Sequence, residues 1–235
     1  METLLERLTA RPRLAAILLD VDGTLAPIVR RPEDSAVPDD ARRELERLAE
    51  RYALLALVTG RPTAAARKIA GLDAVPVIGT HGLELEPEAE RWRERLAELR
   101  GSVAWPVEDK GLSLSYHYRG AADEGRARQQ LEQVAEQARA LGLRARFGRK
   151  VLEIVPPVDA DKGTGIRRLL AQHQLRRALF AGDDTTDLDA FRALDDLELG
   201  VKVAVASPEG PPELRERADV VVEGTAGLVE LLRTL

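Results

Sequence analysis

Short apolar runs alternate with amphipathic stretches over the first 80 residues of the chain. The runs at 14–19, 53–58 and 75–78 stop abruptly at polar residues or glycine, as strands buried on both faces of a sheet do. Between them, the stretches at 39–51 and 63–70 mix apolar and charged positions after a proline, which predicts two helices. Strand–helix–strand spacing of this kind predicts a parallel sheet with right-handed crossovers.

The middle of the chain breaks this rhythm. A predicted strand at 112–118 is followed by a long polar helix at 123–141 and by two strands at 143–147 and 151–155, an order that indicates a small α+β insert. Alternation then returns, with predicted helices at 162–173, 186–194 and 226–232 and strands at 178–181, 199–205 and 220–222. We therefore expect a discontinuous α/β core, 1–83 with 158–235, interrupted by an insert at 84–157.

Composition limits the classes of function that remain. Of the 235 residues, 44% are hydrophobic and 32% are charged, a balance that excludes a disordered chain. The chain has no cysteine, which excludes a disulfide scaffold, a thiolate zinc site and a cysteine nucleophile. The net charge of −5 gives no electrostatic support to a nucleic-acid partner.

The beginning of the chain carries no pattern typical of secretion or membrane insertion. The apolar run at 14–19 has strand length and falls far short of the roughly 20 residues that span a bilayer. We therefore expect a cytoplasmic protein without a membrane partner, and a monomer is the simplest assembly.

Polar residues stand directly after several of the predicted strands. In an open parallel sheet, ligands bind beyond the carboxyl ends of the strands, so these residues are expected to converge. They form the segments Asp20-Val21-Asp22-Gly23-Thr24, Thr59-Gly60-Arg61 and Gly182-Asp183-Asp184-Thr185-Thr186-Asp187. Lys162-Gly163 stands at the start of the helix predicted at 162–173. The sequence thus predicts a polar site at one edge of the sheet.

The chemistry of this site follows from its carboxylates. Asp20 and Asp22 are two residues apart and point to the same side if the chain stays extended through Val21. Crowded carboxylates repel each other unless a cation compensates, and a hard divalent cation such as Mg²⁺ suits oxygen ligands, with Lys162 supplying further positive charge. Such a site favours phosphoryl transfer, in which positioning and charge stabilisation dominate.

These segments resemble, in order and spacing, the four motifs of the haloacid dehalogenase superfamily of phosphohydrolases. Further segments resemble the trehalose-6-phosphate phosphatase family within it: 58–61, 79–84, 110–119, 148–153 and 182–191. The resemblance covers core and insert alike. It implies a Rossmann-like core with a parallel sheet and a small α+β cap domain, 84–157, that recognises the substrate.

The resemblance also implies a role for individual residues. Asp20 would be the nucleophile that takes the phosphoryl group, and Asp22 the acid that protonates the leaving sugar oxygen and then activates water. Thr59 and Lys162 would hold the phosphoryl oxygens. The Mg²⁺ ligands would come from Asp20, Asp22 (through its backbone carbonyl), Asp183 and Asp187. Residues implied to bind the phosphosugar are Gly23, Gly60, Arg61, His81, Gly82, Glu84, His117, Lys150 and Glu153.

Alternatives remain open at this stage. Thr59 could instead cap the helix that follows it, and Lys162 could be a solvated lysine in the first turn of its helix. Asp184 could be a metal ligand, a helix cap or a residue that supports the ligands. For the aromatic residues of the insert, a packed core is favoured over sugar stacking. The function could also be that of a phosphatase for another phosphosugar (sucrose phosphate or mannosylglycerate phosphate), a phosphosugar mutase or a catalytically silent sugar-phosphate sensor.

Overall fold

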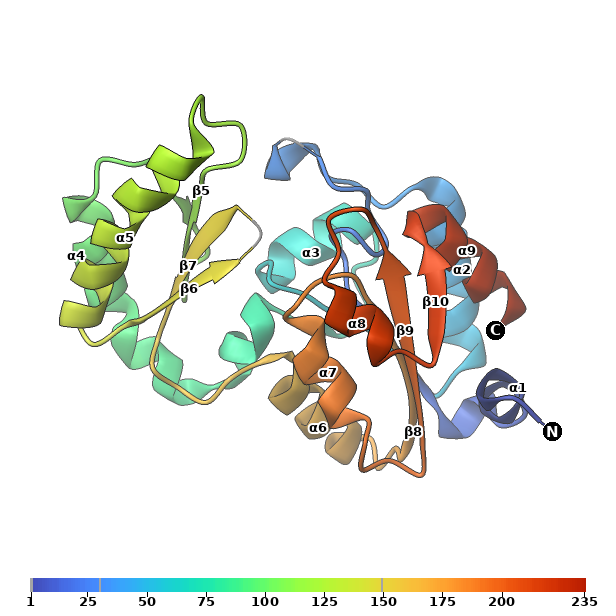
Figure 1. Ribbon diagram of the computed structural model, residues 1–235. Helices are drawn as coiled ribbons and strands as arrows, with labels where there is room; N and C mark the ends of the chain where they lie inside the picture. Colours follow the sequence, from blue (N-terminus) through green and yellow to red (C-terminus); the bar gives the residue numbers. More distant parts are fainter. Residues whose placement is uncertain (1, 30, 149) are drawn as a thin grey trace. The chain divides into compact units, whose positions relative to one another are not determined.

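The computed structural model describes residues 2–29, 31–148 and 150–235. The chain divides into two compact units, Met1–Gly82 with Asp161–Leu235 and, between them, Leu83–Ala160 (Figure 1). The expected insert, 84–157, lies inside the second unit.

The first unit is built on a six-stranded parallel sheet in the order β10-β9-β8-β1-β2-β3. Its strands are β1 (Ala16–Leu19), β2 (Leu54–Val58), β3 (Val77–Ile78), β8 (Arg177–Gly182), β9 (Leu199–Ala206) and β10 (Val220–Glu223). The chain runs from β1 outward to β3 on one side and from β8 outward to β10 on the other. The direction of winding therefore reverses between β1 and β8, and the carboxyl ends of these two strands form the crevice in which open α/β sheets bind ligands.

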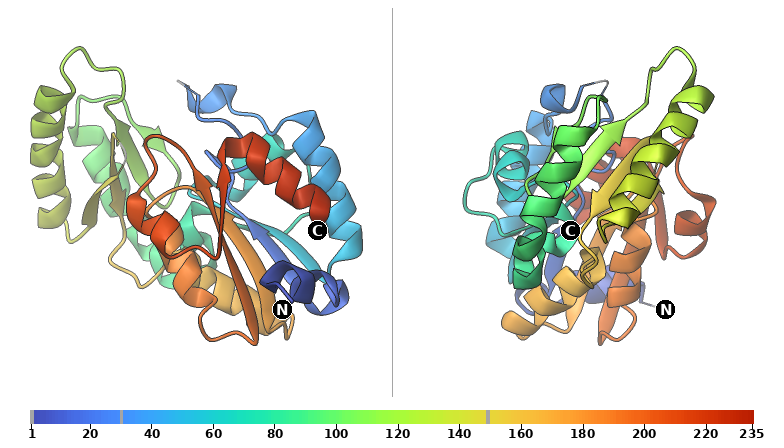
Figure 2. Two further views of the ribbon diagram at one scale, coloured as in Figure 1. Left: turned by 45° about the vertical axis from the view of Figure 1, so that its right-hand side comes forward. Right: turned by 90° about the vertical axis from the view of Figure 1, so that its left-hand side faces the viewer.

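Helices surround this sheet because each presents one apolar stripe to it. They are α1 (Leu4–Thr9), α2 (Asp39–Arg51), α3 (Thr63–Ala70), α6 (Lys162–Gln172), α7 (Asp187–Ala193), α8 (Pro212–Glu216) and α9 (Gly224–Thr234). In α2, Ala41, Leu45 and Leu48 are buried. Helix α9 lies beside α2 in Figures 1 and 2, where Arg47 donates a hydrogen bond of 2.6 Å to the carbonyl oxygen of Leu232.

The predicted elements of this unit agree with the structure to different degrees. Helices α2 and α3 have the predicted bounds. The prediction that the first strand begins at residue 14 was wrong, because Pro12–Leu14 forms a 3₁₀ turn and Leu14 is 53% exposed. The third strand is also shorter than predicted, since only Val77 and Ile78 pair with β2.

The second unit contains a four-stranded antiparallel sheet in the order β4-β5-β7-β6. Its strands are β4 (Glu108–Asp109), β5 (Leu114–His117), β6 (Arg144–Gly148) and β7 (Val151–Val155), and its α-helices are α4 (Arg93–Ser102) and α5 (Glu124–Ala140). Leu96 and Leu99 of α4 and Leu131 of α5 share one buried cluster with residues of β5 and β7, so these helices pack on one face of the sheet.

The aromatic residues of this unit belong to its core. Tyr116 and Tyr118 are buried in the cluster, and Trp92, Trp105 and Phe147 pack against it while partly buried. The expectation of a packed core, in preference to sugar stacking, is therefore confirmed.

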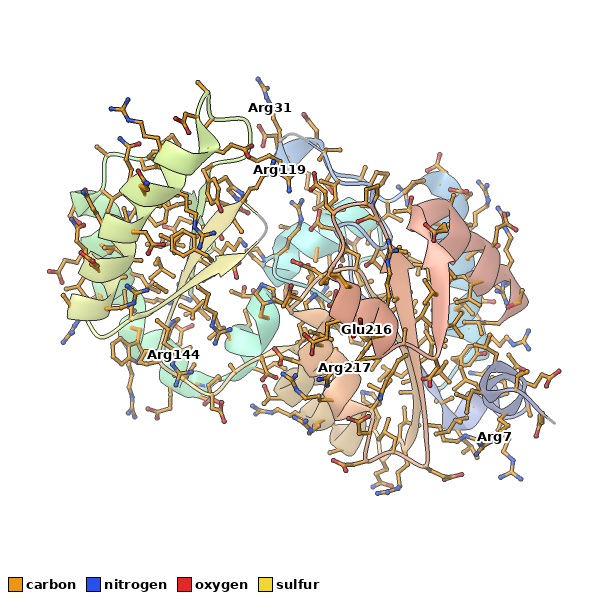
Figure 3. The ribbon with its side chains drawn as sticks, in the orientation of Figure 1. Arg7, Arg31, Arg119, Arg144, Glu216 and Arg217 are labelled. Carbon is orange, nitrogen blue, oxygen red and sulfur yellow. The ribbon has the colours of Figure 1, made fainter. Side chains whose placement is uncertain are left out.

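Charged side chains cover the outer faces of the helices. Arg7 on α1, Glu216 at the end of α8 and Arg217 directly after it are exposed (Figure 3). Within the part of the chain that the structure describes, no helix combines the length and apolarity needed to cross a bilayer.

Candidate active site

Asp20 and Asp183 meet because their strands are neighbours in the sheet. Asp20 directly follows β1, and its N–H donates a hydrogen bond of 3.0 Å to the carbonyl oxygen of Ala181 in β8. Asp183 directly follows β8. Both carboxylates are buried, at 4% and 2% exposure. The convergence expected at the carboxyl edge of the sheet is therefore found in the structure.

The ammonium of Lys162 joins two of the buried carboxylates. Lys162 is the first residue of α6, whose start is fixed by a capping box in which Asp161 and Thr164 exchange side chain–backbone hydrogen bonds. Its Nζ donates to Oδ1 of Asp20 at 2.7 Å and to Oδ1 of Asp187 at 2.6 Å. Burial lowers the pKa of Lys162, but the carboxylates of Asp187 and Asp20 outweigh this effect and hold that pKa above its usual value.

Asp187 organises the loop that carries Asp183. Its Oδ2 accepts hydrogen bonds from the backbone N–H groups of Asp183 and Asp184, both at 2.9 Å. The Asp187 side chain is fully buried, and both of its oxygens hold a donor. Asp187 therefore fixes both the 182–187 loop and the position of Lys162.

The cluster of Asp20, Asp183 and Asp187 fits a cation. One carboxylate oxygen from each lies within 4.8 Å of those from the other two. Burial raises the pKa of the Asp20 carboxyl well above its usual value; Lys162 opposes this rise, and the charges of Asp187 and Asp183 add to it. One ammonium does not balance three buried carboxylates, so a further positive charge suits the site, and a donor set made only of oxygens favours a hard divalent ion.

Close approach of the backbone at Gly23 completes this cluster. Gly23 has φ +83°, and a Cβ added there would lie 2.2 Å from Oδ2 of Asp183. Any other residue would therefore be strained and would displace the Asp183 carboxylate.

The Asp22 carboxyl lies in a different environment from that of Asp20. Arg61 binds it through two contacts, Nε to Oδ2 at 2.5 Å and Nη2 to Oδ1 at 2.7 Å. The hydroxyl of Ser35 donates a third hydrogen bond, to Oδ1, at 3.1 Å. The Asp22 side chain is 31% exposed, so it can reach a group outside the buried cluster.

Thr59 directly follows β2 and is buried at 1% exposure. Its N–H donates to the carbonyl oxygen of Ile78, and its Oγ1 accepts from the N–H of Arg61 at 3.2 Å. The N–H of His81 donates to the carbonyl oxygen of Thr59 at 2.9 Å. The His81 ring lies against Gly60, where a Cβ would come within 2.4 Å of Nε2. The 59–61 loop and His81 therefore form one connected corner of the first unit.

Gly82 is the last residue of the first unit before the second unit begins, and its backbone is in the left-handed region, with φ +90°. A Cβ there would lie 2.7 Å from the carbonyl oxygen of Asp161, the residue that caps α6. Gly82 thus permits a close approach of the backbone beside Lys162.

The other expected substrate-binding residues lie in the second unit. Glu153 in β7 pairs with Ser115 in β5, and His117 pairs with Val151, so Glu153 and His117 share one face of that sheet. Glu153 forms an ion pair with Lys110 at 3.4 Å between Oε1 and Nζ.

His117 contacts Glu108 at 2.8 Å through Nε2. Lys150, with φ +59°, binds Glu124 at the start of α5 at 3.0 Å. Glu84 is exposed in the 3₁₀ segment Thr80–Leu85. In this unit the structure therefore pairs three of the expected residues with charged partners.

Sequence reasoning missed several of these contacts. Ser35 stands in a polar segment outside every motif, and nothing in the pattern marks it. Arg61 was expected at the substrate, and its contact with Asp22 was not predicted. Glu108 and Glu124, the partners of His117 and Lys150, could not be found because strand register and loop path decide those pairs.

Comparisons with known proteins show the family to which the chain belongs. A family model described as trehalose-phosphatase matches residues 18–103 and 92–221. A probable trehalose-phosphate phosphatase of Sinorhizobium fredii is 34% identical over 209 residues, which cover 82% of this chain and 78% of that protein. A trehalose-phosphate phosphatase of Mycobacterium marinum is 32% identical over 208 residues, 76% of this chain and 51% of that protein.

Another relative is an uncharacterized glycosyl hydrolase of Mycobacterium tuberculosis, 33% identical over 218 residues. The match covers 81% of this chain but only 16% of that protein, so the chain spans a small part of this much longer relative.

Solved structures show the same fold. A trehalose-6-phosphate phosphatase related protein superimposes with a TM-score of 0.73 at 26% identity, covering 93% of this chain and 95% of that chain. The C-terminal domain of a C. albicans trehalose-6-phosphate phosphatase superimposes with a TM-score of 0.77 at 21% identity, covering 97% of this chain and 94% of that chain. A haloacid dehalogenase-like hydrolase of Bacteroides thetaiotaomicron superimposes with a TM-score of 0.63 at 17% identity, covering 93% of this chain and 98% of that chain. The predicted fold, a haloacid dehalogenase core with an inserted α+β cap domain, is confirmed, and the chain belongs to the trehalose-phosphatase family.

Proposed function

We propose that this protein is an Mg²⁺-dependent phosphatase that hydrolyses trehalose 6-phosphate to trehalose and phosphate. The observation that carries the proposal is the buried arrangement of Asp20, Asp183 and Lys162 at the β1–β8 crevice, in a chain of the trehalose-phosphatase family. Two relatives named as trehalose-phosphate phosphatases, at 34% and 32% identity, support the choice of substrate.

The metal would be held by oxygen atoms at the start of the 183–187 loop and after β1. We assign it to carboxylate oxygens of Asp20 and Asp183 and to the backbone carbonyl of Asp22. Asp187 would steady the ligands, since its oxygens already hold Lys162 and two backbone N–H groups. When bound, Mg²⁺ would offset the negative charge that the phosphoryl group brings to the carboxylates.

The chain's own residues would carry out two transfers. In the first, a carboxylate oxygen of Asp20 attacks phosphorus, the bond from phosphorus to the sugar oxygen breaks, and Asp22 gives its proton to that oxygen. In the second, Asp22 as a carboxylate takes a proton from water, and the water oxygen attacks phosphorus of the aspartyl phosphate. Phosphate leaves and the Asp20 carboxylate is restored. Lys162 and Thr59 would hold the phosphoryl oxygens throughout.

The second unit would recognise the sugar. Its residues Glu84, His117, Lys150 and Glu153 offer charged donors and acceptors that could exchange their present partners for sugar hydroxyls. On the first unit, Gly23, Gly60, Arg61, His81 and Gly82 would border the phosphate. In this proposal, 84–157 acts as a cap that excludes water during the first transfer.

The test is phosphate release from trehalose 6-phosphate, with Mg²⁺ and with EDTA, beside sucrose, glucose and mannosylglycerate phosphates. We expect Mg²⁺-dependent release from the trehalose ester and little from the others. Strong turnover of another ester would keep the chemistry and contradict the substrate. Dependence on a bisphosphorylated sugar would indicate a mutase, and no turnover at all would favour a sensor.

A matched pair of variants tests the nucleophile. Asp20→Asn is nearly isosteric and should lower the rate by at least about 10³-fold while leaving the fold intact, because the attacking oxygen is lost. Asp73→Asn, at an exposed position of the same unit, should leave the rate unchanged. Substantial residual activity of Asp20→Asn would contradict the covalent mechanism.

A further inference from the structure

The segment between β1 and α2 returns to the site through one residue. Ser35 follows the 3₁₀ turn Pro32–Asp34 and is 6% exposed. Its hydroxyl donates to Oδ1 of Asp22, thirteen residues earlier in the chain, at 3.1 Å. Ser35 belongs to none of the four motifs, and the roles proposed above do not use it.

Both ends of this segment are fixed by the backbone. At its start, the N–H of Gly23 donates to the carbonyl oxygen of Ala26 at 2.7 Å, and the N–H of Ala26 donates to that of Val21 at 2.8 Å. At its end, Val37 is 1% exposed in the core, and its N–H donates to the carbonyl oxygen of Ile69 at 3.1 Å. Both ends of the segment that carries Ser35 are therefore anchored by contacts that do not involve the Asp22 side chain.

Ser35 and Arg61 hold the Asp22 carboxyl in different ways. Arg61 contacts both oxygens, whereas Ser35 contacts Oδ1 alone. A guanidinium can only donate hydrogen bonds, so its contact with an Asp22 oxygen weakens when that oxygen carries a proton. A hydroxyl both donates and accepts, so Ser35 can stay bound to Oδ1 before and after Asp22 gives its proton away.

We propose that Ser35 is a positioning residue: its hydroxyl keeps the Asp22 carboxyl oriented toward the leaving oxygen of the substrate. This inference rests on the proposed phosphatase function and on the role of Asp22 within it. Ser35 itself touches neither the phosphoryl group nor the sugar in this scheme.

The leaving group makes the inference testable. When the bond from phosphorus to a sugar oxygen breaks, the bonding electron pair stays on an alkoxide that needs the proton of Asp22. When the substrate is 4-nitrophenyl phosphate, the same electron pair stays on a stable nitrophenolate that needs no proton. Because kcat/KM reports the steps up to the first irreversible one, a badly oriented Asp22 lowers kcat/KM for the sugar ester far more than for the aryl ester.

The experiment compares kcat/KM for trehalose 6-phosphate and 4-nitrophenyl phosphate. For Ser35→Ala we expect kcat/KM for the sugar ester to fall about tenfold, a part of the 10²–10⁴-fold that a positioned acid supplies, while the value for the aryl ester changes less than about twofold. Ser35→Thr keeps a hydroxyl and should restore most of the loss. Ser207→Ala is the matched control, because the Ser207 hydroxyl has no hydrogen-bond partner among the described residues.

Three results would overturn the inference. These are equal falls of kcat/KM for the two esters, no fall for either, or a Ser35→Thr variant as impaired on the sugar ester as Ser35→Ala. If Ser35→Ala does not fold, the nearly isosteric Ser35→Cys replaces it, because a thiol is only a weak hydrogen-bond donor. Its kcat/KM should also fall for the sugar ester and change little for the aryl ester.

The failure of the proposed function looks different. If the unaltered protein hydrolyses another sugar phosphate, the proposed substrate is wrong and the same ratio is measured with that ester. If it hydrolyses neither a sugar ester nor the aryl ester, both proposals fail together.

Discussion

Replacing Lys162 by Met tests whether one ammonium compensates the buried carboxylates. Met keeps an unbranched apolar stem of similar length, so the packing of the side chain is largely preserved. What is lost is the positive charge that contacts Asp20 at 2.7 Å and Asp187 at 2.6 Å, with the Lys162 side chain 3% exposed. The variant leaves the carboxylates of Asp20, Asp183 and Asp187 buried without a cation.

The expected loss of stability is large. Removing one partner of a buried ion pair costs about 3–5 kcal/mol, because the remaining charge is uncompensated. Lys162 also stands at the start of α6, where the helix dipole disfavours a cation. Removing its charge therefore recovers about 0.3–1 kcal/mol of stability. The net loss is then about 3 kcal/mol, a substantial part of the 5–15 kcal/mol by which domains are ordinarily stable.

The loss should depend on pH in a defined direction. Burial already raises the pKa of Asp20 in the native protein, and Lys162 opposes that rise. Without the ammonium, that pKa lies higher still, so the folded variant holds the Asp20 proton more tightly than the native protein does. The free energy of unfolding of the variant therefore falls as pH rises from the ordinary carboxyl value through the raised one, so the difference from the native protein is larger at pH 8 than at pH 5.

The assay is urea unfolding in EDTA at pH 5 and pH 8, with Lys68→Met, an exposed lysine of α3, as the control. Mg²⁺ added at pH 8 should recover more stability in Lys162→Met than in the native protein. A loss below about 1 kcal/mol, or one equal at both pH values, would refute the view that Lys162 neutralises the cluster.

Three further variants test other contacts. Tyr116→Phe removes a buried hydroxyl without a hydrogen-bond partner among the described residues, so urea unfolding at pH 7.5 should show no loss beyond about 1 kcal/mol. Burial raises the pKa of Tyr116 to about 12, so the native protein should lose more stability than the variant as pH rises above the ordinary value of 10; equal losses between pH 9 and 11 would contradict this. Asp161→Ala should cost about 1 kcal/mol by removing the cap of α6, and should also lower phosphate release by shifting Lys162. Asp123→Ala, which removes the cap of α5, should show a similar loss in thermal unfolding without the extra loss of activity; equal activity of the two variants would argue against the link between cap and Lys162.

The core of the fold was predictable because its strands are buried on both faces. Continuous apolar runs mark β1, β2 and β8, and they do not need a tertiary contact to be recognised. The starts of α2 and α3 were predictable for a local reason as well, since Pro38 and Pro62 occupy the N-cap positions. The third strand was predicted too long because Pro76 lacks the N–H that a paired residue donates.

In the site too, contacts set by the backbone were predictable from the sequence, whereas contacts set by loop path and side-chain rotamers were not. The meeting of Asp20 and Asp183 follows from strand order and from the rule for the carboxyl edge, both of which depend on the backbone. The Ser35 contact and the double contact of Arg61 with Asp22 depend on the path of an irregular loop and on side-chain rotamers. No periodic pattern encodes either of these.

The charge arrangement at the β1–β8 crevice opposes local folding preferences in two ways. A lysine at the first position of α6 faces the positive end of the helix dipole, and Asp20 is buried so deeply that its pKa rises. Arg177, another buried cation, shows what a structural role looks like: its guanidinium donates to the backbone carbonyl of Arg7 and lies 3.9 Å from the carboxylate of Glu198. Lys162 instead holds together carboxylates that repel one another. Such conflicts with local preference are expected where a site is shaped for a ligand, because ligand binding can recover the unfavourable energy.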